Sequence, residues 1–131
     1  MKKANLITIV LVFIFLSAFL FYILNYNSKI TYGTKTSQSA VTIDITPLEF
    51  KNGKFYVDIK LNTHTVDLDN YDFQKAVILN YNNLIFNPEE SLKLSGHHFS
   101  GTFIFNVNEK PKFFTIKVLG IPDIEERLFT W

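Results

Sequence analysis

Residues 41–61 read VTIDITPLEFKNGKFYVDIKL, and this stretch decides the fold class of the 131-residue chain. Apolar residues occupy every second position from Val41 to Ile45 and again from Phe55 to Leu61. Such alternation predicts strands with one buried face. Between the two runs, Lys51-Asn52-Gly53-Lys54 is a turn sequence typical of a β-hairpin. Two antiparallel strands joined by a tight turn are therefore expected here.

The remainder of the chain continues this pattern of short strands and turns. Residues 76–79 form a continuous apolar run typical of a central strand, and residues 99–105 alternate again. Shorter candidates follow the same spacing, at residues 84–86, 113–119 and 126–131. About seven strands separated by turn residues predict an all-β fold, an antiparallel seven-strand-type β-sandwich of immunoglobulin-like or cupredoxin-like type.

The first 25 residues have a different character. Residues 4–24, ANLITIVLVFIFLSAFLFYIL, carry no charge, and Lys2 and Lys3 precede them. About 20 apolar residues in a helix can cross a bilayer, and basic residues before such a run keep the N-terminus cytoplasmic. The prediction is one N-terminal transmembrane helix over residues 1–25, a signal-anchor. A cleaved secretory signal is the alternative, although its apolar region is usually shorter.

Composition limits the function of the remaining residues. Polar residues 26–40 predict a flexible linker, and residues 41–131 an extracytoplasmic β-sandwich domain. Beyond Ile30 the chain has ten Lys/Arg and twelve Asp/Glu, a net charge of −2. Such a near-neutral, mixed surface argues against nucleic acid as a partner. The chain has no cysteine, which excludes disulfides, thiolate chemistry and blue-copper sites.

The three histidines lie in two stretches that break the alternation, residues 62–72 and 94–101. Both stretches fall between predicted strands, so they could meet at one end of a sandwich. His64, His97 and His98, with Asp67 or Asp69, would then suit zinc or copper. The alternative is a structural role in the loops. Adjacent residues on a regular strand face opposite sides, so His97 and His98 share a metal only if the backbone near Gly96 is irregular.

The same stretches contain the other candidate ligand-binding residues. These are Thr63, Asp67, Asp69, Gly96 and Ser100. The acidic residues do not have the spacing of an EF-hand, and short carboxylates in loops commonly close Asx turns. Ser95 and Ser100 near the histidines lack a nucleophile elbow, so no enzyme activity is expected. Trp131 is expected to close one end of the core, with its indole N–H bonded to a backbone carbonyl.

Three segments together resemble a prokaryotic β-sandwich domain family of unknown function whose members are secreted or membrane-anchored. Residues 63–68 read THTVDL, residues 96–101 read GHHFSG, and residues 126–131 read ERLFTW. They match the family's THxVDL, GHHxSG and C-terminal ERxFxW segments. The resemblance covers roughly residues 41–131 and departs at Ser95 and at residues 123–125. It implies a secreted β-sandwich and no particular reaction.

The sequence thus predicts a membrane-tethered, extracytoplasmic, non-enzymatic binding or interaction module. Its working surface would be the end that carries the two histidine loops, and its partners would be the membrane and an envelope protein. A metal-binding domain using His64, His97 and His98 with zinc or copper is one alternative. A structural accessory subunit of an envelope complex, with the helix of residues 4–24 as its contact surface, is the other.

Overall fold

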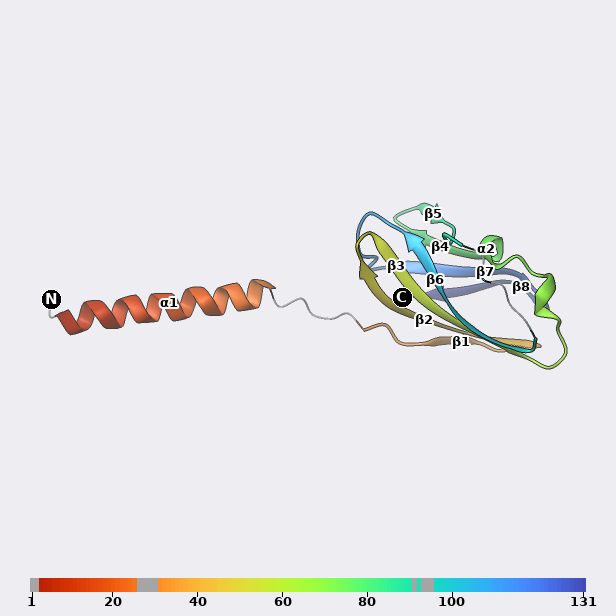
Figure 1. The fold of residues 1–131 in the computed structure, drawn as a ribbon, viewed down its shortest axis with the longest axis horizontal. Coiled ribbons are helices and arrows are strands. Elements are labelled where there is room, and N and C mark those ends of the chain that lie inside the picture. The colour runs from red at the N-terminus through yellow and green to blue at the C-terminus, as the bar shows by residue number, and fades with distance from the viewer. Residues whose placement is uncertain (1–2, 26–30, 91, 93–95) are drawn as a thin grey trace. The chain divides into compact units, whose positions relative to one another are not determined.

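The structure, a computed structural model, describes residues 3–25, 31–90, 92 and 96–131 (Figure 1). The chain divides into two compact units, Met1–Ile30 and Thr31–Trp131. The first contains helix α1 (Lys3–Asn25). The described residues of the second form eight strands and two short helices.

The predicted membrane anchor needs correction. A spanning helix requires about 20 predominantly apolar residues in succession. Among the residues that the structure describes, no helix meets both the length and the apolarity that crossing a membrane demands. The sequence predicted a single-pass membrane protein with a cytoplasmic N-terminus and an extracytoplasmic C-terminal domain. That prediction of localisation is therefore wrong.

The strands of the second unit form two antiparallel sheets. The first sheet has the order β1-β2-β3-β6 and the second the order β5-β4-β7-β8. Figure 1 shows the two sheets as layers, and this arrangement confirms the predicted all-β, sandwich-like fold. The first sheet comprises β1 (Lys35–Ser37), β2 (Val41–Lys51), β3 (Lys54–Thr63) and β6 (His98–Asn106). The second comprises β4 (Val77–Tyr81), β5 (Leu84–Phe86), β7 (Phe114–Ile121) and β8 (Ile124–Thr130).

The hairpin predicted from residues 41–61 is present as β2 and β3. Their register runs from Val41 opposite Thr63 to Lys51 opposite Lys54. The turn residues Asn52 and Gly53 have φ angles of 53° and 77°. A two-residue hairpin turn with both central residues in the left-handed region matches the natural twist of the strands, and Asn-Gly accepts that conformation best.

The β unit starts before the boundary expected at residue 41. Of the predicted linker 26–40, residues 26–30 lie outside the described part of the chain, and residues 31–40 belong to the β unit. Tyr32 is only 8% exposed. Its ring lies edge-on to Phe55 and Phe114, and its hydroxyl donates a 2.6 Å hydrogen bond to the Pro111 carbonyl. A three-residue strand is too short to show alternation, so β1 left no periodic signal.

The core lies between the sheets and extends under one long connection. Alternate residues of β3 and β6 are buried, including Phe55, Phe103 and Phe105. The β3–β4 connection contains η1 (Leu68–Asn70) and α2 (Phe73–Ala76), and it contributes the fully buried Leu68 and Phe73. Each such side chain stabilises the fold by about 1.5–3 kcal/mol relative to exposure.

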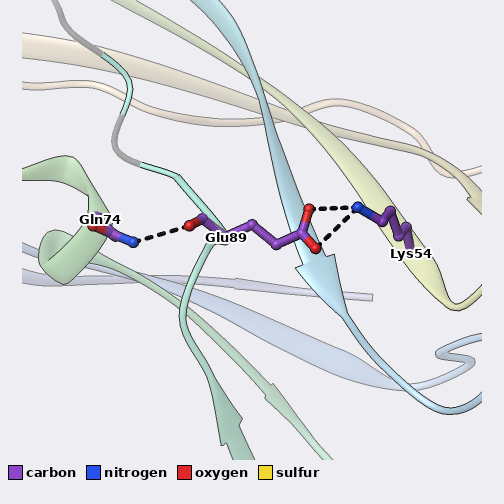
Figure 2. A network of polar contacts seen from close by, with 3 residues as sticks. All are labelled: Lys54, Gln74 and Glu89. Atoms are coloured by element: carbon purple, nitrogen blue, oxygen red, sulfur yellow. Dashed lines mark hydrogen bonds and ion pairs between the residues drawn. The ribbon is translucent and has the colours of Figure 1, made fainter.

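An ion pair holds the β5–β6 connection against the start of β3 (Figure 2). The Lys54 ammonium donates to both carboxylate oxygens of Glu89, at 3.0 and 2.8 Å. The backbone carbonyl of Glu89 accepts a 3.2 Å hydrogen bond from the Gln74 side chain on α2. This bond and the ion pair join α2, the β5–β6 connection and β3, three segments that are distant in sequence.

Candidate functional site

The end of β3 and the start of β6 bring two of the three histidines together. Asn62 lies opposite His98 in the β3–β6 ladder, and His64 comes directly after Thr63, the last residue of β3. The His64 and His98 rings are edge to face, with centroids 5.5 Å apart and planes at 81°. Both residues are exposed.

His97 stands apart from this pair. The Thr63 N–H donates a 2.9 Å hydrogen bond to the His97 carbonyl. The ladder of β3 and β6 therefore continues regularly to His97, the residue before the start of β6. Consecutive residues of a regular ladder face opposite sides. The irregular backbone lies one position earlier, at Gly96, whose φ is +80°. Accordingly, no three His, Asp or Glu side chains of the described residues are grouped as a metal would require.

Two of the polar residues predicted for binding in these loops have structural partners. Thr63 is 2% exposed, and its hydroxyl accepts the backbone N–H groups of Thr65 and Val66 at 3.3 and 3.2 Å. Asp67 caps η1 by accepting the Asp69 N–H at 3.0 Å, and its second oxygen accepts from Asn70 at 3.1 Å. The Asx-turn interpretation therefore accounts for Asp67.

The remaining predicted residues are surface positions. Asp69 is exposed within η1, and Gly96 is exposed in the turn before β6. Ser100 lies on the outer face of the first sheet, opposite Lys60, and is also exposed.

Arg127, for which no role was predicted, lies inside the edge of the sandwich. Arg127 is 3% exposed and donates to the Val41 carbonyl at 2.6 Å, the Ser39 hydroxyl at 2.5 Å and the Pro122 carbonyl at 3.2 Å. Burial lowers the pKa of its guanidinium, and the nearby Asp123 carboxylate opposes that change. Its position alternates with the buried Phe129, a spacing that could have indicated an inward side chain.

Further contacts fasten the segment before β2 to β8 and the C-terminus. The Trp131 indole N–H donates a 2.8 Å hydrogen bond to the Gly33 carbonyl, as predicted for a backbone partner. The Trp131 ring stacks on Phe114, with centroids 5.3 Å apart. The Lys35 ammonium lies over the Trp131 ring and donates to the Thr130 carbonyl. β1 is thereby held beside β8, at the edges of the two sheets.

A groove lies between these two edge strands. It has a volume of about 640 Å³ and is lined by all of β1 and most of β8. Arg127 and Ser39 join the edges at one end, and Lys35 and Thr130 join them at the other. The side chain of Leu128 is 59% exposed, although β8 belongs to a sandwich with a large apolar core.

The β8 backbone presents polar groups to this groove. Phe114 and Trp131 exchange two backbone hydrogen bonds, at 3.1 and 3.0 Å, so Trp131 faces β7. Hydrogen-bonded and non-hydrogen-bonded pairs alternate in an antiparallel ladder. Glu126, Leu128 and Thr130 therefore direct their N–H and C=O groups away from β7. The bond from Lys35 to the Thr130 carbonyl agrees with that direction.

Comparisons with known proteins add no relative. No family model, curated protein or solved structure matches this chain. The resemblance based on the THTVDL, GHHFSG and ERLFTW segments stays a prediction.

Proposed function

We propose that Thr31–Trp131 is a non-enzymatic binding module that holds an extended peptide segment along the β8 edge. The observation that carries the proposal is the row of backbone groups at Glu126, Leu128 and Thr130, which point away from β7 toward the groove; of these groups, the Thr130 carbonyl already accepts from Lys35. An extended peptide that adds to a sheet edge gains main-chain hydrogen bonds from such a row. The proposal moves the working surface from the histidine end to the β1–β8 groove.

The connectivity of the strands supports this position for a binding surface. The chain crosses between sheets after β3, β5 and β6, and it places β2-β3-β6 opposite β5-β4-β7-β8. We propose that this strand order is the Greek-key arrangement of an immunoglobulin-like sandwich. The first and last strands of such a chain lie at neighbouring edges, where β1 and β8 line the groove here.

The groove also indicates the form of the ligand. A strand paired with residues 126–130 would have about five residues and, at about 3.3 Å per residue, a length of about 17 Å. The exposed Leu128 side chain offers an apolar contact, and the Lys35 ammonium offers a charge at the end of the groove near Thr130. A short extended peptide with an apolar residue and an acidic end fits these features.

The test uses the full chain and a displayed library of heptapeptides, from which binders are selected and their Kd values measured. Leu128→Pro removes the outward N–H without touching the core, because proline is tolerated on an edge strand whose N–H faces away from its partner. Leu128→Thr is the matched control, since it keeps the N–H. We expect Leu128→Pro to bind at least about tenfold more weakly than Leu128→Thr, equal to about 1.4 kcal/mol, because both variants lose the apolar Leu128 contact and only Leu128→Pro also loses the N–H.

Two results would overturn the proposal. One is a library selection that yields no peptide binding tighter than millimolar. The other is a set of selected peptides that bind wild type and Leu128→Pro equally, provided that both proteins melt at similar temperatures.

A further inference from the structure

We propose that His64 and His98 together hold a divalent transition-metal ion of the copper and zinc type. The two side chains come from the end of β3 and the start of β6, and β6 is the edge of the first sheet opposite β1. This site is separate from the β1–β8 groove and does not depend on peptide binding there. It also differs from the three-histidine set predicted from the sequence, because His97 is not a member.

The separation of the rings fits a shared ion. A ring nitrogen binds zinc at about 2.0–2.1 Å, which places each ring centroid about 3.2 Å from the metal. Two such ligands at angles between about 90° and 120° have their centroids about 4.5–5.5 Å apart. The observed separation of 5.5 Å is at the upper end of this range. Binding requires the two exposed side chains to turn from their edge-to-face arrangement until one nitrogen of each ring faces the ion.

The backbone around both histidines is already ordered. Asn62 pairs with His98, and the Thr63 N–H is bonded to the His97 carbonyl at 2.9 Å. The Thr63 hydroxyl accepts the N–H groups of Thr65 and Val66 at 3.3 and 3.2 Å, and this fixes the turn that carries His64. Holding ligands in place before binding lowers the entropic cost of capturing the ion.

Both imidazoles are available to a metal. Across the described ranges, neither the His64 ring nor the His98 ring makes a hydrogen bond or an ion pair; each has the ring contact with the other. Imidazole is the side chain best suited to copper and zinc when cysteine is absent. Asp67 lies near His64 in sequence but uses both carboxylate oxygens to hold η1.

A site with two protein ligands leaves coordination positions open. Structural zinc sites have four protein ligands, and an ion with open positions completes its shell with water or with a donor from another molecule. We therefore expect reversible binding of one ion per chain, weaker than binding in a four-ligand structural site.

The experiment titrates Cu(II) and Zn(II) separately into the full chain and measures affinity by calorimetry and thermal melting. His97→Asn is the matched control, because it removes the neighbouring exposed histidine and leaves the pair intact. We expect wild type and His97→Asn to bind one ion with similar affinity, while His64→Asn and His98→Asn each bind at least tenfold more weakly. Electron paramagnetic resonance of the copper form should show nitrogen ligation that the double variant His64→Asn/His98→Asn loses.

The outcomes are decisive in either direction. Equal losses in all three single variants, no binding tighter than millimolar in wild type, or unchanged copper ligation in the double variant would each overturn the site. All three histidines are exposed, so the metal-free variants should melt close to wild type. If a variant fails to fold, the NMR signals broadened by Cu(II) in wild type still decide: broadening centred on His64 and His98 supports the site, and broadening elsewhere overturns it.

Discussion

The guanidinium of Arg127, on β8, donates a 2.6 Å hydrogen bond to the carbonyl oxygen of Val41, at the start of β2. β2 and β8 belong to different sheets, so this bond joins the two layers at their edge. The same guanidinium reaches Ser39 and Pro122, and Arg127 is 3% exposed. One buried cation thus satisfies acceptors from three segments and closes one end of the β1–β8 groove.

Replacing Arg127 should destabilise the domain, because the oxygen atoms that accept its hydrogen bonds lose their donor. In Arg127→Met the buried Val41 carbonyl loses its 2.6 Å donor and keeps the longer 3.3 Å bond from the Ser39 hydroxyl, and the expected loss is about 2–4 kcal/mol of the free energy of unfolding. Arg127→Lys keeps the charge but lacks the planar fork that reaches several acceptors, so it should lose less. Urea denaturation measures both, and a loss below about 1 kcal/mol in Arg127→Met would show that the guanidinium is not a fastening point.

Trp131 should stabilise the fold through its ring and its indole N–H. The Trp131→Ala change removes the stacking on Phe114 and the bond to the Gly33 carbonyl, and we expect a loss of about 2–3 kcal/mol. Trp131→Phe keeps most of the stacking and should lose about half as much. Thermal and urea unfolding of the two variants separate the ring from the hydrogen bond. Equal losses in both would assign the effect to the hydrogen bond alone.

Gly101 has no room for a side chain. A Cβ built there would lie 2.7 Å from the Phe99 ring and 2.9 Å from a Leu92 methyl carbon. Both neighbours are side-chain ends that can shift, so Gly101→Ala should lose about 1–2 kcal/mol rather than unfold the domain. Gly33→Ala is the control, because nothing lies within 4 Å of its Cβ position. Comparable urea midpoints for the two variants would contradict the packing argument.

The Lys54–Glu89 pair predicts a dependence of stability on pH (Figure 2). The hydrogen bond from Lys54 lowers the pKa of the Glu89 carboxyl below its ordinary value of 4.5. Because the folded-state pKa is depressed, the contribution of Glu89 is present above pH 4.5 and is lost as pH falls through the lowered folded pKa. Glu89→Gln should therefore be less stable than wild type at pH 7, and the difference should shrink below pH 4.5.

The control for this pair is ionic strength. Both side chains are partly exposed, so added salt should reduce the difference between wild type and Glu89→Gln at pH 7. Urea unfolding at several pH values and salt concentrations measures it. A difference that stays constant from pH 7 to pH 3 would exclude the ion pair as its cause.

Local patterns accounted for the parts of the fold that depend on neighbours in sequence. Alternation between Val41 and Leu61, with Asn52-Gly53 between the strands, predicted β2, β3 and their turn. A strand with one buried face has apolar residues at every second position, and this period can be read from the sequence. The need of an indole N–H for a hydrogen-bond partner predicted that Trp131 would bond to a backbone carbonyl, but it did not identify the Gly33 carbonyl.

Tertiary structure alone decided which distant residues meet. β1 is too short to show a period, and its place beside β8 depends on Lys35, Arg127 and Trp131 reaching across the sandwich edge. The separation of His97 from the His64–His98 pair depends on where the regular β3–β6 ladder ends, which only the bond between Thr63 and His97 shows. By itself the sequence determined the longer strands, because their burial is periodic along the chain. The buried arginine, the groove and the histidine pair were decided in three dimensions, because contacts between segments far apart in sequence leave no such period.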